Sequence, residues 1–131
     1  MLNYSKIVGF VGTSKPTEAR RFYEETLGLQ LVEESPFALV FACGDTTVRV
    51  QKVKHLATPP YTSLGWEVEN IAVTVQKLTS KGVVFKQFDG LSQDDAGIWV
   101  TPDGSQIAWF HDPDGNTLSL TQPVLKQPVL K

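Results

Sequence analysis

The sequence has little of the side-chain chemistry from which disulfides and metal sites are built. Its 131 residues include one cysteine, Cys43, and two histidines, His55 and His111. A single cysteine cannot form an internal disulfide, and its reduced state fits a reducing compartment. No positively charged segment followed by an apolar one, the mark of a signal peptide, opens the chain. We therefore expect a cytoplasmic protein.

Long apolar runs and an excess of basic charge are missing as well. The longest apolar run, FALVFAC (37–43), is much shorter than the roughly 20 residues of a membrane-spanning helix. Twelve basic and 14 acidic residues give a net charge of −2 without a basic cluster. We expect neither a membrane nor nucleic acid as a partner. What is present, 41% hydrophobic and 20% charged residues, is typical of one soluble globular domain.

The apolar pattern predicts the same order of elements twice, a strand, a helix and three strands. Pro16 and Gly28 delimit the first helix, and Asn70 and Gly82 delimit the second. The two terminal glycines are 82 − 28 = 54 residues apart, which indicates an internal duplication. The predicted elements are strands at 6–12, 29–34, 37–43, 46–53, 63–68, 83–88, 98–101, 105–111 and 116–122, and helices at 16–28 and 71–82.

This duplication predicts the domain organisation. Residues 1–53 form a first βαβββ module and residues 63–121 a second one, within one domain overall. Residues 54–62, which contain Pro59-Pro60, read as a linker. Residues 122–131 repeat the pentapeptide QPVLK, and we predict a mobile tail there.

The stretch HDPDGN (111–116) carries a histidine and two aspartates but is predicted to be a turn. The glycine and acid spacing of a calcium-binding EF-hand loop is absent. Pro113 fixes φ and Gly115 supplies a positive φ, as a turn requires. His111 is either a structural or surface histidine at the strand end or a general base, and no orienting partner can be seen in the sequence.

Two motifs give the chain a resemblance to a known family. The segments ARRFYEETLGLQLV (19–32) and IAWFHDPDGNTLSL (107–120) resemble the vicinal oxygen chelate superfamily, which includes glyoxalase I, extradiol dioxygenases and bleomycin-resistance proteins. The resemblance covers about residues 5 to 121. It implies an α+β fold in which two βαβββ modules form a curved, barrel-like mixed sheet around a cleft, with the helices outside. It also implies a homodimer.

Metal-dependent members of that superfamily bind a divalent ion with side chains from the first and last strand of each half. The resemblance carries these positions to Val8, Arg49 (or Gln51 after a register slip), Ser63 and Ser119. A valine offers no ligand atom and an arginine repels a cation. We therefore expect no metal and no cofactor, and a binding protein rather than an enzyme.

The same positions, with nearby aromatic residues, predict a binding site instead. Arg49, Gln51, Ser63 and Ser119 would form a polar cleft floor. Trp66, Trp99 and Trp109 would provide stacking walls, with Phe41 and Tyr61 close by. Two alternatives stay open. Arg49 would instead pair internally, for instance with Glu67, or the aromatic residues would serve only to pack the core.

The sequence therefore predicts a metal-independent protein that sequesters a small aromatic or amphipathic compound, as antibiotic-resistance members of the bleomycin-resistance type do. One alternative is a metal-dependent lyase or dioxygenase whose ligands lie at other positions. Another is a regulatory or structural module that binds a protein partner through its dimer edge.

Overall fold

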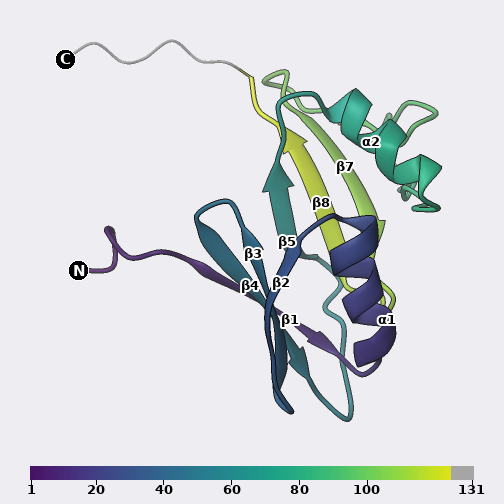
Figure 1. Cartoon of the computed structure of the whole chain (residues 1–131). Coiled ribbons are helices and arrows are strands. Elements are labelled where there is room, and N and C mark those ends of the chain that lie inside the picture. The colour runs from purple at the N-terminus through teal and green to yellow at the C-terminus, as the bar shows by residue number, and fades with distance from the viewer. Residues whose placement is uncertain (125–131) are drawn as a thin grey trace. The chain divides into compact units, whose positions relative to one another are not determined.

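The computed structural model describes residues 1–124, in which strands and helices follow the predicted order (Figure 1). Most of the predicted tail, from residue 125 onward, lies outside the described residues. The elements are β1 (Val8–Thr13), α1 (Pro16–Arg21), η1 (Phe22–Thr26), β2 (Gln30–Glu34), β3 (Ala38–Cys43), β4 (Thr46–Lys52), β5 (Thr62–Glu67), α2 (Ile71–Ser80), β6 (Trp99–Val100), β7 (Gln106–His111) and β8 (Thr117–Gln122). No helix in this part of the chain is long and apolar enough to cross a membrane.

The strands form two four-stranded sheets with the same internal order. The first has the order β1-β4-β3-β2 and the second β5-β8-β7-β6. In the first sheet β1 pairs with β4 in parallel, whereas β3 pairs with β4 and with β2 antiparallel. The predicted α+β fold of two βαβββ modules is confirmed. The described strands make two separate sheets and not one closed barrel.

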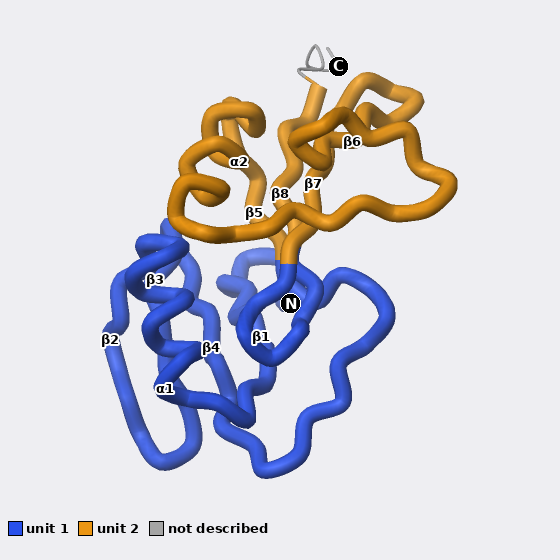
Figure 2. Tube along the Cα trace, turned by 90° about the vertical axis from the view of Figure 1, so that its right-hand side faces the viewer, with its two compact units in different colours: residues 1–64, 111–118 blue, residues 65–110, 119–131 orange. Residues whose placement is uncertain are grey.

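The chain divides into two compact units, shown in Figure 2. Residues 1–64 and 111–118 form the first, and residues 65–110 with those from 119 onward form the second. The segment 111–118, from the last residue of β7 to the first residues of β8, thus belongs to the first unit. The predicted boundaries between modules and linker stay a prediction.

The core of the first unit lies between the first sheet and the helix that follows β1. Ala19 and Tyr23 from the helical segment and Phe41 and Val50 from the sheet are fully buried. The rings of Tyr23 and Phe41 have centroids 5.7 Å apart. Phe41 is therefore a core residue, and its predicted place beside a ligand cleft is wrong.

The predicted helix 16–28 is real but changes its winding halfway. After α1, residues Phe22–Thr26 form a π-helical turn, in which the Leu27 amide donates to the Phe22 carbonyl at 2.9 Å. Gly28 then takes a φ of +76°, which a residue with a side chain adopts only under strain. The local widening of the helix has no simple sequence signal.

The second helix begins and ends as predicted. The Asn70 side chain accepts a hydrogen bond from the Val73 amide at 3.2 Å, which is the N-cap interaction. At the other end the Gly82 amide donates to the Thr79 carbonyl, and Gly82 has a φ of +96°. The buried stripe of α2 consists of Ile71, Val75 and Leu78.

The predicted strand at 83–88 is wrong. The Gln93 side chain, rather than a neighbouring strand, bonds two backbone groups of this segment. Its Nε2 donates to the carbonyls of Lys86 and Gly97, both at 2.8 Å, and its Oε1 accepts from the Phe88 amide at 2.6 Å. The one backbone bond from this segment to β7 joins the Lys86 amide to the Trp109 carbonyl at 2.8 Å. A side chain reaching back five to seven residues leaves no periodic signal in the sequence.

Candidate functional site

The side chains of β4 alternate between the core face of the first sheet and a face that carries polar groups. Val48 and Val50 are buried at 3% and 0% exposure, whereas Arg49 is half-buried and Gln51 is exposed. Val48 and Val50 thus lie on one face of β4 and Arg49 and Gln51 on the other, as the period of two along a strand requires. The sheet face with Arg49 and Gln51 is therefore the one that points away from the core of the first unit.

The register of the first sheet sets the neighbours of Arg49. Arg49 lies opposite Phe10 on β1 and opposite Val40 on β3. Gln51 lies opposite Ala38, and opposite Gly12, which adds no side chain. Since paired residues project to the same side of a sheet, Phe10 flanks the Arg49 guanidinium.

These residues line a pocket within the first unit. It has a volume of about 250 Å³ and is lined by Phe10, Phe37, Ala38, Arg49 and Gln51. Phe10 is 59% and Phe37 76% exposed, unusually high values for large apolar side chains. The sequence prediction named Arg49 and Gln51 but missed both phenylalanines. The alternation of Val8, Phe10 and Gly12 along β1 is the signal that could have found Phe10.

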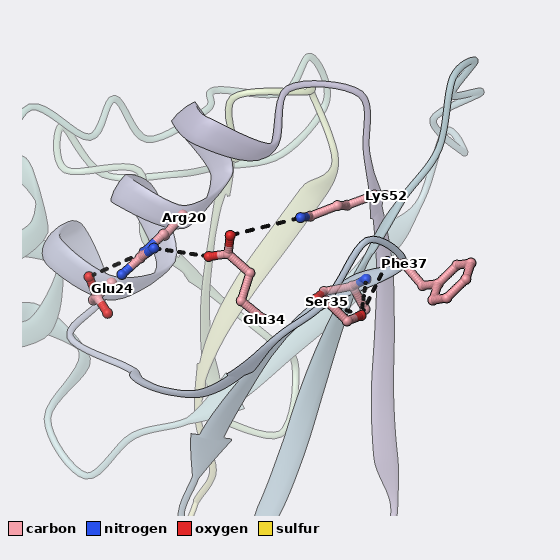
Figure 3. A network of polar contacts seen from close by, with 7 residues as sticks. Arg20, Glu24, Glu34, Ser35, Phe37 and Lys52 are labelled. Carbon is pink, nitrogen blue, oxygen red and sulfur yellow. Dashed lines mark hydrogen bonds and ion pairs between the residues drawn. The ribbon is translucent and has the colours of Figure 1, made fainter.

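A network of ion pairs holds the hairpin beside this pocket. The Arg20 guanidinium contacts Glu34 Oε1 at 2.9 Å, and Lys52 Nζ lies 4.0 Å from Glu34 Oε2. Figure 3 shows Glu34 reached by both cations, while the Phe37 ring points away from this network. These pairs are partly solvent-exposed and contribute little to stability.

No acid of the first unit forms an ion pair with Arg49 among its described residues. Arg49 is thus a half-buried cation in a mostly apolar pocket. Glu67 belongs to the second unit, so its proposed pairing with Arg49 stays a prediction.

In the second unit, Ser119 is buried at 8% exposure and lies against Gly65. A Cβ added to Gly65 would come within 2.5 Å of Ser119 Oγ, so a larger residue at this position would require the serine side chain to move. The Ser119 hydroxyl has no hydrogen-bond partner in the described part of the chain. Ser63 is half-buried near the start of β5.

Two of the three predicted tryptophans come together in the second unit. Trp99 and Trp109 have ring centroids 6.2 Å apart, and Phe88 packs edge-on against Trp109 at 5.4 Å. Trp99 lies opposite Ile107 in the β6–β7 register, which puts it on the same side of the sheet as Trp109. Both indoles are half-buried, so they offer ring surface to a partner. Phe88 was missed because its segment was read as a strand.

Trp66 does not join this pair. It is half-buried on β5, and alternation along the strand directs its side chain to the face opposite that of Ser63 and Gly65. Gly65 meets Ser119 on the latter face. Trp66 and Ser63 therefore cannot line the same face of β5. Tyr61, just before the strand, is 68% exposed.

A larger groove, of about 670 Å³, runs between α2 and the segment 83–98 in the second unit. None of the predicted site residues lines it. It is lined by two acids, of which Asp94 is engaged by its own loop, accepting from the amides of Ala96 and Ile98 at 2.9 and 2.8 Å. Unlike the pocket around Arg49 and the Trp99–Trp109 pair, this groove has neither a basic side chain nor a pair of aromatic rings among its described lining residues.

The turn 112–115 forms a buried polar cluster that sequence reasoning missed. Asp112 accepts hydrogen bonds from the Tyr23 hydroxyl at 2.7 Å, from the Asn116 side chain at 2.8 Å and from the amides of Asn116 and Asp114 at 2.9 and 3.0 Å. Asn116 also donates to the Gly12 carbonyl. Burial, and then the charge of Asp112, raise the pKa of Tyr23 far above its ordinary value.

The second aspartate of the turn fixes the start of the first helix. Asp114 accepts from the Thr13 hydroxyl at 2.5 Å and from the amide and hydroxyl of Ser14 at 2.8 and 3.0 Å. The predicted turn is confirmed, since the Gly115 amide donates to the Asp112 carbonyl and Gly115 has a φ of +88°. The acids of DPDG are thus structural. His111 is exposed.

The positions carried over from metal-dependent enzymes do not fit a divalent cation. Val8 and Arg49 project from the same face of the first sheet, and they offer a methyl group and a positive charge. Ser63 and Ser119 offer only neutral hydroxyls. No three His, Cys, Asp or Glu side chains gather into a metal-binding group anywhere within residues 1–124.

The family profile described as Glyoxalase/Bleomycin resistance protein/Dioxygenase superfamily matches residues 7–120. The chain belongs to this superfamily. The resemblance found in the FY…LG and DPDGN segments is therefore confirmed. No curated protein sequence matches the chain.

Solved structures of similar fold include members with different activities. A bleomycin resistance determinant encoded on the transposon Tn5 has a TM-score of 0.73 and 18% identity over 92% of this chain and 99% of its own. Lactoylglutathione lyase from Agrobacterium tumefaciens has a TM-score of 0.72 and 14% identity over 91% and 93%. TnmS3, an antibiotic binding protein from a Streptomyces species, has a TM-score of 0.66 and 25% identity over 95% and 99%.

Proposed function

We propose that this superfamily member is a metal-independent protein that binds and sequesters a small aromatic or amphipathic compound. The observation that carries the proposal is the pocket around Arg49. Where a metalloenzyme of the superfamily would have ligands, this chain has Val8 and Arg49, flanked by the exposed rings of Phe10 and Phe37. Such a pocket supports binding by shape, stacking and a few polar groups.

Two further observations support the proposal. TnmS3 is an antibiotic binding protein, and the Tn5 protein is a bleomycin resistance determinant. The half-buried pair Trp99 and Trp109 provides stacking surface of the kind such ligands need. We keep as part of this proposal the polar groups Gln51, Ser63 and Ser119, a cytoplasmic location and a homodimer. Trp66, which faces away from Ser63 and Ser119 on β5, is left out of the proposed site.

A titration of aromatic antibiotics and metabolites into the protein, followed by calorimetry and tryptophan fluorescence, tests the proposal. We expect saturable binding by at least one compound, weakened several-fold by Phe37→Ala. Val84→Ala is the matched control, because Val84 is 77% exposed but lines the groove beside α2. Binding that is lost in Val84→Ala and kept in Phe37→Ala would move the site to that groove.

The competing enzyme hypothesis has its own test. Metal analysis of the purified protein should find no stoichiometric Ni, Zn, Fe or Mn, and a chelator should leave ligand binding unchanged. A tightly bound metal together with metal-stimulated lyase or dioxygenase activity would replace the binding proposal. Absence of binding by every compound of the panel would also count against it.

A further inference from the structure

The charge of the pocket in the first unit narrows the class of ligand. Arg49 is the only charged residue among its lining residues, and Gln51 is the only other polar side chain. Glu34, held by Arg20 and Lys52, lies on the opposite face of the sheet, because it pairs with Leu39 and Leu39 pairs with Val50. Glu33 shares the face of Arg49 but is exposed and forms no ion pair within residues 1–124. A half-buried guanidinium beside two phenyl rings has lost part of its hydration, and no acid among the described residues of the first unit pairs with it.

We propose that the compound bound in this pocket is an aromatic carboxylate, whose acid group pairs with Arg49 while its ring packs against Phe10 and Phe37. This inference rests on the proposed binding function and makes it more specific. A planar guanidinium presents paired N–H donors that match the two oxygens of a carboxylate. Because no acid is among the described residues that line the pocket, a cationic ligand would be repelled by Arg49 without an opposite charge to hold it.

The geometry of the strands favours this mode of binding. Phe10 and Arg49 are direct neighbours across β1 and β4, so a ring stacked on Phe10 brings a substituent within reach of the guanidinium. Gln51, two residues along β4 on the same face, can donate from its side-chain amide to the second carboxylate oxygen.

The size of the pocket sets what it can hold. Its volume of about 250 Å³ lies just below the roughly 300–1,000 Å³ of sites for drug-sized ligands. One or two fused rings with an acid group therefore fit, and a larger ligand would extend beyond the pocket. The probes of choice are 2-naphthoate and two analogues of the same shape, the neutral 2-naphthamide and the cationic 2-naphthylmethylammonium.

Isothermal titration calorimetry of the full chain with these three probes tests the inference. We expect 2-naphthoate to bind at least about tenfold more tightly than 2-naphthamide, and the ammonium compound to bind most weakly. Arg49→Gln should abolish the preference for the acid, and Arg49→Lys should keep only part of it, since an ammonium lacks the paired donors. Arg21→Gln, an equal change of charge on an exposed helix residue, should leave the preference unchanged.

Each other result has a distinct meaning. Equal binding of the acid and the amide by the unmodified protein would overturn the carboxylate assignment without needing any variant to fold. If neutral or cationic aromatic compounds bind while no aromatic acid does, the assignment fails and the proposed function stands. If neither these probes nor the wider panel of aromatic compounds binds, both fail.

Discussion

At the scale of single residues, Tyr23 and Asp112 show how the family motif stabilises the fold. The Tyr of the FY pair and the first Asp of DPDG are 89 positions apart in the sequence, yet the Tyr23 hydroxyl donates to Asp112 at 2.7 Å. Both residues are buried, at 0% and 5% exposure. A buried carboxylate is tolerated here because four donors surround it.

Tyr23→Phe should reduce the free energy of unfolding at neutral pH by about 1.5–3 kcal/mol, the range for hydrogen bonds to charged groups. The difference from the unmodified protein should shrink as the pH rises above about 10. Above about pH 10 the tyrosine of the unfolded chain ionises, whereas Tyr23 in the folded protein keeps its proton because its pKa is raised. The stability that the Tyr23 hydroxyl contributes is therefore full below about pH 10. It is lost progressively as the pH rises above that value. Urea unfolding between pH 7 and 11 measures this. Tyr61→Phe, at a 68% exposed position, is the control. A stability difference that stays constant up to pH 11 would contradict the assignment.

Residue-level prediction from the sequence succeeded where it depended on alternation and failed where it depended on distant partners. The orientation of Arg49 followed from the period of two along β4. The partner of Asp112 did not, because no local pattern indicates which distant tyrosine donates to it. Phe41 was misplaced for the same reason, since an aromatic residue in a strand has the same signal whether it lines a cleft or contacts Tyr23.

At the scale of elements, glycines and caps made the helices predictable, and side-chain bonding made one segment unpredictable. Gly28, Asn70 and Gly82 act where the sequence indicated. Residues 83–88 have an apolar, strand-like composition but take no place in the sheet, and Gln93 binds their backbone instead. The composition of a segment indicates only its preference for strand or helix. Tertiary contacts then decide which conformation the segment adopts when the alternatives have similar energies.

Gln93→Ala should therefore loosen the segment 86–98 without unfolding the helix beside it. Three hydrogen bonds to the backbone are lost, and the unpaired groups at this partly exposed site should cost about 1–3 kcal/mol in total. Hydrogen exchange measured by mass spectrometry should show faster exchange of the Phe88 amide and its neighbours, with α2 unchanged. Gln76→Ala, at an exposed site on α2, is the matched control. An equal acceleration throughout the second unit would contradict a local role for Gln93.

At the scale of the whole molecule, the repeated strand order was predictable because duplication leaves a period in the sequence. The orders β1-β4-β3-β2 and β5-β8-β7-β6 correspond to the two glycine-terminated helices 54 residues apart. The assignment of residues 111–118 to the first unit was not predictable. It depends on Asp112 and Asp114 binding Tyr23, Thr13 and Ser14, and such pairings are invisible to a reading that follows the chain in order.

The proposed homodimer has its best candidate surface along β1, an edge strand of the first sheet. Phe10 of β1 is 59% exposed, and Tyr4 and Ile7, in the segment before the strand, are 95% and 80% exposed. Exposed apolar residues beside an unpaired strand edge favour pairing with another chain. Ile7→Glu should shift the protein from dimer to monomer, because a carboxylate would have to be desolvated in the interface. Sedimentation velocity over a range of concentrations measures the shift, and Val84→Glu, 77% exposed in the second unit, is the control. A protein that is monomeric at every concentration would refute the dimer, and a dimer equally sensitive to both changes would refute β1 as its interface.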